Sequence, residues 1–225
     1  GPAVLASGNI LLDARAGTVS TAHITLDAGV LSTAGSVSLL SAGDIQQNAV
    51  IEAGGVDATI DLRAQGAITM AAGTKTTSYN AQVRLEAVSG DITLTEIDTR
   101  AGALNTAKVA VIARSGSIVG GGGASAIHIA TADLLLHSGS GIGVANSPLL
   151  TSVETLSARA MNGGVFLTET DALEITGVSV GINRVTESGG ADALSPDVQE
   201  DITTIGETAH VVLTTLDGSL TISGG

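Results

Sequence analysis

The sequence predicts an all-β solenoid of the parallel β-helix class, and three observations lead to that prediction. Short runs of alternating apolar and polar residues recur along the chain, corners of small residues join them, and large aromatic side chains are nearly missing. Residues 83–94 show the pattern most clearly, because two alternating runs flank a corner that ends at Gly90. Such a unit indicates two strands with a tight bend between them.

The unit repeats with a nearly fixed period of 23 to 28 residues. A period in this range indicates a solenoid rather than a globule. The units lack the leucine frame of leucine-rich repeats and the length that two helices need, so two or three short strands per turn remain. We expect roughly nine turns. The corner glycines that mark them are Gly17, Gly43, Gly66, Gly90, Gly116, Gly141, Gly164, Gly190 and Gly218.

The composition agrees with a narrow apolar core. Of 225 residues 44% are hydrophobic, yet the chain has one Phe, one Tyr and no Trp. Stacked Ile, Val, Leu and Ala fill a thin column without large rings, whereas a globular core of this size normally uses aromatics. The absence of Cys excludes disulfides and cysteine-based zinc sites. No apolar run approaches the ~20 residues of a membrane-spanning helix, and no signal peptide opens the sequence.

The repeat runs through the chain without a linker, so we expect one β-helix segment over residues 3–225. Gly1-Pro2 is interpreted as the remnant of a cleaved tag, and the segment as a window from a longer chain. Two interruptions are expected. One is a polar loop near residues 74–80, and the other is an acidic loop near residues 191–208 that contains Pro196.

Charged residues predict the register between turns. Asp61 precedes Arg84 by 23 residues, and Arg63 precedes Glu86 by the same interval. In a parallel stack with this offset both pairs bring opposite charges together, at a few tenths of a kcal/mol each. The same register stacks the inward side chains Leu62, Leu85 and Val111 into one dry column.

The outward positions form two mixed columns, which we expect to be solvated faces. Polysaccharide-cleaving β-helices instead gather several carboxylates and a base on one face. We therefore predict no enzyme activity, no catalytic residue and no cofactor. One column is Asp13, Leu40, Arg63, Glu86, Ile112 and His137, and the other is Leu11, Ser38, Asp61, Arg84, Ala110 and Leu135.

The remaining candidate site is a metal site in the acidic loop. Asp197, Glu200 and Asp201 lie within five residues and offer the oxygen ligands that calcium prefers. The simpler interpretation, which we prefer, is a solvated loop. The histidines are scattered and alternate with apolar residues, so outward strand positions are expected for them: His23, His128, His137 and His210.

The net charge of −13 argues against nucleic acid and anionic membranes as partners, because phosphates are repelled. No direct insertion into a membrane is expected.

Three segments together resemble the repeats of large secreted bacterial adhesins of the filamentous-haemagglutinin type. They are Ala42–Ile45 (Ala-Gly-Asp-Ile), Ser89–Ile92 (Ser-Gly-Asp-Ile) and Leu173–Val180. The low Cys and aromatic content and the acidic charge are similar as well. The resemblance implies a right-handed parallel β-helix in a secreted or surface-exposed stalk, at the bacterial outer membrane, that takes part in attachment.

The expected function is therefore structural and adhesive. The segment would act as a rigid stalk and attachment surface, with neighbouring repeats of the same chain and a cell-surface protein or glycan receptor as partners. The alternative is a carbohydrate-binding or polysaccharide-cleaving β-helix protein.

Overall fold

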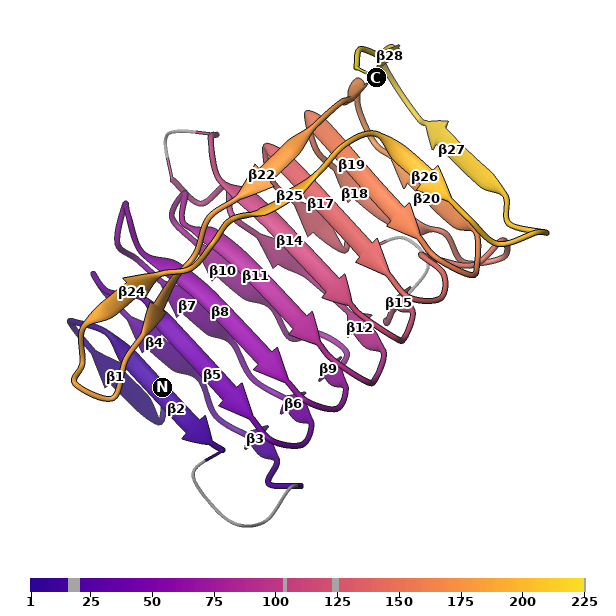
Figure 1. Cartoon of the computed structure of the whole chain (residues 1–225). Coiled ribbons are helices and arrows are strands. Elements are labelled where there is room, and N and C mark those ends of the chain that lie inside the picture. The colour runs from indigo at the N-terminus through magenta and orange to yellow at the C-terminus, as the bar shows by residue number, and fades with distance from the viewer. Residues whose placement is uncertain (16–20, 103–104, 123–125, 225) are drawn as a thin grey trace.

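The computed structural model describes residues 1–15, 21–102, 105–122 and 126–224. Every regular element in this part of the chain is a β-strand, and successive strands coil around one axis (Figure 1). The predicted parallel β-solenoid is confirmed. The coil has about six turns rather than nine. The strands of the third side run from β3 to β15 (Ile118–Gly120), and beyond β15 only isolated parallel bridges at Ile142 continue it, so the later levels are less regular.

Three parallel sheets form the sides of the coil, and each regular turn adds one strand to each sheet. Sheet I contains β1 (Val4–Ala6), β4 (Val30–Ser32), β7 (Ile51–Ala53), β10 (Thr76–Ser78), β13 (Ile97–Asp98), β16 (Ile129–Ala130), β18 (Leu149–Ser152), β20 (Val165–Glu169) and β27 (Val211–Thr215). Sheet II contains β2 (Ile10–Ala14), β5 (Val37–Ser41), β8 (Thr59–Ala64), β11 (Gln82–Ala87), β14 (Lys108–Ala113), β17 (Asp133–Ser138), β19 (Thr155–Ala160), β21 (Leu173–Ile175) and β28 (Leu220–Ile222), and β26 (Ile202–Thr204) pairs with β19. Sheet III contains β3 (Ile24–Leu26), β6 (Ile45–Gln47), β9 (Ile68–Met70), β12 (Ile92–Leu94) and β15.

The predicted register is confirmed. In β8 and β11, Asp61 lies beside Arg84 and Arg63 beside Glu86. Both predicted outward columns follow the observed strand pairing from β2 to β17. The predicted inward column is also present: Leu62, Leu85 and Val111 are neighbours in sheet II, and each is 0% exposed. A single apolar core thus runs along the axis of the coil.

The Gly-Asp corner explains how successive turns stack. A Cβ on Gly116 would lie 2.3 Å from the carbonyl oxygen of Gly90, so the close approach of the two corners requires glycine. The aspartate that follows the corner binds the next turn. Asp44 accepts a hydrogen bond from the amide of Ala67 (2.8 Å), and Asp91 accepts one from the amide of Ser117 (2.7 Å). The motif therefore joins turns through their backbone.

The two expected interruptions differ from the prediction. The segment near 74–80 contains β10, whose Thr76 and Ser78 point into the coil and are 0% exposed, so it continues sheet I. The run Thr-Thr-Ser contains no apolar residue, so the sequence alone predicts a loop there. Gly190 is not a corner of the coil, because it lies in a hairpin turn in which the amide of Thr186 donates to its carbonyl. The corner expected at Gly17 lies outside the described residues.

Candidate functional site: a strap across sheet II

A long antiparallel hairpin leaves the coil after β21 and returns before β26. We call residues 177–200 the strap. Its strands form two pairs, β22 (Val178–Val180) with β25 (Asp197–Gln199) and β23 (Asn183–Val185) with β24 (Ala191–Ala193). In Figure 1 the strap is the orange ribbon that crosses sheet II toward the first turns. The region expected as an acidic loop near 191–208 therefore contains three short strands, β24, β25 and β26.

The middle of the strap holds buried charges. Arg84 is 6% exposed and lies 3.3 Å from Asp61, 2.8 Å from Glu86 and 2.7 Å from Asp197 of the strap. From the strap, Arg184 reaches the second oxygen of Asp61 at 2.6 Å. Asp61 is 0% exposed, and Glu86 is 3% exposed. The two carboxylates thus lie under the strap with arginine partners on both sides, as buried charges require.

Glu86 has three arginines around it. Burial raises the pKa of Glu86, but the positive charges of Arg84, Arg114 and Arg63 outweigh it and hold the pKa below the ordinary value. A carboxyl whose pKa is lowered in the folded protein stabilises the fold at higher pH and loses that contribution as the pH falls through its folded value. These ion pairs therefore stabilise the fold at neutral pH.

Apolar and amide contacts anchor the remainder of the strap. Val178 and Val180 pack on the outward side chains Ala110, Ile112 and Leu135 and form a second core outside the coil. Further along, Gln199 donates to the carbonyl of Leu136 (2.9 Å) and to the hydroxyl of Ser157 (3.0 Å).

The tip of the strap binds the first turns through backbone atoms. The amide of Val185 donates to Ser38 Oγ (2.9 Å), and Asn183 exchanges two hydrogen bonds with the hydroxyl of Thr59 (2.7 and 3.1 Å). At the far end, Asn9 Nδ2 donates to the carbonyl of Gly189 (3.0 Å). In this part of the coil the strap covers the outward columns, which we expected to be solvated. The expectation was wrong because the sequence pattern shows which side of a strand is outward, not what covers it.

The three candidate calcium ligands do not converge. Asp197 binds Arg84, so its carboxylate faces the charge cluster. Asp201 has a positive φ of 52° and a buried Oδ1 that lacks a partner among the described residues. Glu200 lies near Gly177, at the base of the strap. The described residues contain no group of three or more His, Asp or Glu side chains that could hold a metal ion. The expectation of no cofactor and the less favoured alternative of calcium both stay predictions.

The histidines occupy different environments. His23 lies beside Asp44 at 3.3 Å and is half exposed, and His210 is exposed. His128 is buried and accepts a hydrogen bond from the amide of Leu150 at Nδ1 (3.1 Å). His137 lies 3.3 Å from Gln199 of the strap. Burial lowers the pKa of both His128 and His137, so both are neutral at pH 7. His137 thus has the expected outward strand position, in β17 under the strap, whereas His128 is buried just before β16, contrary to the expectation.

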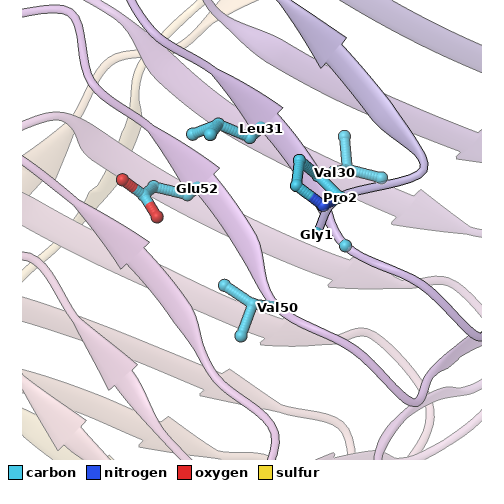
Figure 2. A pocket seen from close by; sticks show the side chains of 7 residues that line it. Gly1, Pro2, Val30, Leu31, Val50 and Glu52 are labelled. Atoms are coloured by element: carbon cyan, nitrogen blue, oxygen red, sulfur yellow. The ribbon is translucent and has the colours of Figure 1, made fainter.

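Several hollows mark the surface. One, shown in Figure 2, has a volume of about 280 Å³ and lies where Gly1 and Pro2 meet Leu31, Val50 and Glu52. Another, of about 590 Å³, lies at the first turn beside β2 and β3. Two more, of about 320 and 520 Å³, lie between the tip of the strap and the coil. This last pair combines the strap with early turns of the coil, which lie far from it in the sequence.

Comparison with protein-family models, with curated proteins and with solved structures found no match to this chain. In the described part of the chain no helix is long and apolar enough to cross a membrane. Function must therefore be argued from the geometry.

The strap is the functional element that the sequence prediction missed. Its two halves have weak alternation, and Pro196 and the paired glycines favoured a loop. A signal was nevertheless present, because the outward column of sheet II includes the uncharged residues Ser38, Ala110 and Leu135. Such a column is typical of a covered face.

Proposed function

We propose that this chain is a structural and adhesive β-helical segment of a large bacterial adhesin, secreted or displayed at the cell surface. It acts as a rigid stalk that projects more distal parts of the protein and offers a surface for attachment. The resemblance of its corner motifs to adhesin repeats and the continuous parallel sheets support this role.

The observation on which the stalk proposal depends is the length of coil that the strap spans. It contacts seven consecutive levels of sheet II, from the turn before β2 to β19. In an ordinary solenoid each repeat contacts only its neighbours, so the rod can bend or open at any single junction. Because the strap contacts many levels, opening one junction also strains the contacts at the others, and the rod is stiffer.

Deletion of the strap tests the stalk proposal. In the deletion variant a short Gly-Ser linker joins Thr176 to Asp201 and replaces residues 177–200. We expect a lower melting temperature, a broadened or stepwise unfolding transition and a less rigid rod in small-angle scattering. The matched control is Val198→Ser, because Val198 lies on the strap but is 63% exposed. An unchanged, single sharp transition in the deletion variant would contradict the proposal.

The location is tested separately. Antibodies against this segment should label intact, unpermeabilised cells of the source bacterium, or its culture medium. Label that appears only after permeabilisation would exclude the surface role.

The second candidate function is carbohydrate binding. The hollows beside the tip of the strap favour it, because they are lined by polar side chains, of which Asp57 and Asn183 have no side-chain partner among the described residues.

A further inference from the structure

The two hollows at the tip of the strap adjoin each other, and we call them together the trench. The first lies between the strap and β8 and β11, and the second lies between the strap and the turns before β5 and β8. They share five lining residues: Val56, Asp57, Ala58, Asn183 and Ala193. Their volumes, about 320 and 520 Å³, fall in the range of small-ligand sites. The trench depends on the strap, because Asn183 and Ala193 of β23 and β24 line both hollows.

Some polar groups of the trench are already used by the protein. Thr59 exchanges hydrogen bonds with the backbone of Asn183. The side-chain amide of Asn80 donates to Thr106 Oγ1 and accepts from its backbone amide, both at 2.9 Å. In the second hollow, Asn9 binds the amide of Ser36 and the carbonyl of Gly189. These groups form the walls of the trench and have little hydrogen-bonding capacity left for a ligand.

Three polar groups remain free among the described residues. Gln82 Oε1 is buried and lacks a hydrogen-bond partner. Neither the carboxylate of Asp57 nor the side-chain amide of Asn183 has a hydrogen-bond or ion-pair partner among the described residues. An unpaired buried acceptor costs about 1–3 kcal/mol. A ligand does not reach this oxygen, because it is sealed from solvent, so Gln82 offers the hollow the nitrogen of its amide.

The hydrogen-bonding capacity of these groups identifies the class of ligand. Asp57 only accepts, so an anion, which also accepts, fits poorly beside it and is repelled by Asp57 and by the net charge of −13. The amide nitrogens of Gln82 and Asn183 donate, so an ammonium group, which only donates, leaves them unpaired. Hydroxyl groups donate and accept and satisfy both kinds of partner. The apolar side chains Val56 and Ala58 suit the carbon faces of a sugar ring.

From this arrangement we propose that the trench between the tip of the strap and the coil binds a neutral, polyhydroxylated ligand, a short stretch of glycan. Gln82 and Asn183 bind hydroxyl groups through their amides, and Asp57 accepts from a third. The elongated shape holds consecutive sugar units, one in each hollow. This assignment deepens the attachment role proposed above, which does not by itself specify a ligand.

The test starts with an array of immobilised neutral, sialylated, sulfated and amino-sugar glycans. We expect the whole chain to bind neutral glycans, and titration calorimetry with the best neutral binder then compares variants. Gln82→Leu and Asp57→Ala should each weaken binding by about tenfold, the loss expected for one good hydrogen bond. Gln46→Leu is the matched control and should bind unchanged, because Gln46 is half-buried in β6 of sheet III, which does not line the trench.

Folding of the variants is followed by melting temperature. Because Gln82 Oε1 has no partner to lose, Gln82→Leu should melt at the same or a higher temperature. If it fails to fold, Asp57→Ala decides, since Asp57 is exposed. Three outcomes overturn the proposal: no neutral glycan is bound, only anionic or amino glycans are bound, or binding survives both substitutions. None of these outcomes affects the scattering or melting tests of the stalk, so the two proposals fail separately.

Discussion

Two faces of the same coil differ in the exposure of their outward side chains, although the same repeat builds both. On sheet III the outward side chains are exposed or half-buried: Thr25, Gln46, Thr69 and Thr93. On sheet II the outward side chains under the strap are buried: Ser38, Asp61, Arg84, Ala110 and Leu135. The difference comes from one hairpin inserted far along the chain. Outward alternation therefore gives the orientation of a side chain, whereas its exposure depends on what else packs there.

The strongest test of this difference in exposure is to place a charge on each of the two faces. Leu135→Asp should destabilise the fold by about 4 kcal/mol, because the new carboxylate lies under Val178 and Val180 without a cation. This corresponds to a fall in melting temperature of roughly 10 °C.

The matched substitution on the uncovered face is Thr93→Asp, which should change stability by less than about 0.5 kcal/mol. Equal losses from the two substitutions would mean that the strap does not cover sheet II in solution.

A smaller effect separates buried from surface arginines in the charge cluster. Arg84→Met should cost about 3 kcal/mol, because Asp197 loses its ion-pair partner and Asp61 and Glu86 each lose one of theirs. Arg63→Met removes a partner of the same Glu86, but the Arg63 side chain is 29% exposed. Its loss should cost less than about 1 kcal/mol. Chemical denaturation measures both, and a cost for Arg63→Met as large as that for Arg84→Met would contradict this ranking.

The coil could be predicted from the sequence because its information is local and repeated. The 23-residue offset that pairs Asp61 with Arg84 also relates β5 to β8, and the Gly-Asp corner at Asp44 returns two turns later at Asp91, so the turns support one another. The strap could not be predicted in this way. It occurs once, and its contacts join residues as far apart as Asn9 and Gly189. The trench forms between the strap and the coil, so it could not be predicted from Gln82 without the strap.

The carboxylates under the strap also differ from one carboxylate inside the coil. Glu169 is 0% exposed and points inward in β20, on the same side as Leu167. It accepts hydrogen bonds from Thr151 Oγ1 (2.7 Å) and from the amides of Val153 (3.1 Å) and Thr170 (2.9 Å). No cation is paired with it among the described residues. Burial therefore raises the pKa of Glu169, despite these hydrogen bonds.

The smallest expected effect follows from that raised pKa. A carboxyl whose pKa is raised on folding contributes stability below its unfolded value, near 4.5, and loses it as the pH rises through the folded value. Glu169→Gln keeps the acceptor oxygen for the amides without the charge, so it should stabilise the fold at pH 7 by on the order of 1 kcal/mol. The gain should shrink as the pH is lowered toward 4.5. Urea denaturation of both proteins across this range measures the difference, which removes the acid sensitivity that both share through Glu86. A gain that stays constant with pH, or a loss at pH 7, would mean that Glu169 is stabilised as an anion.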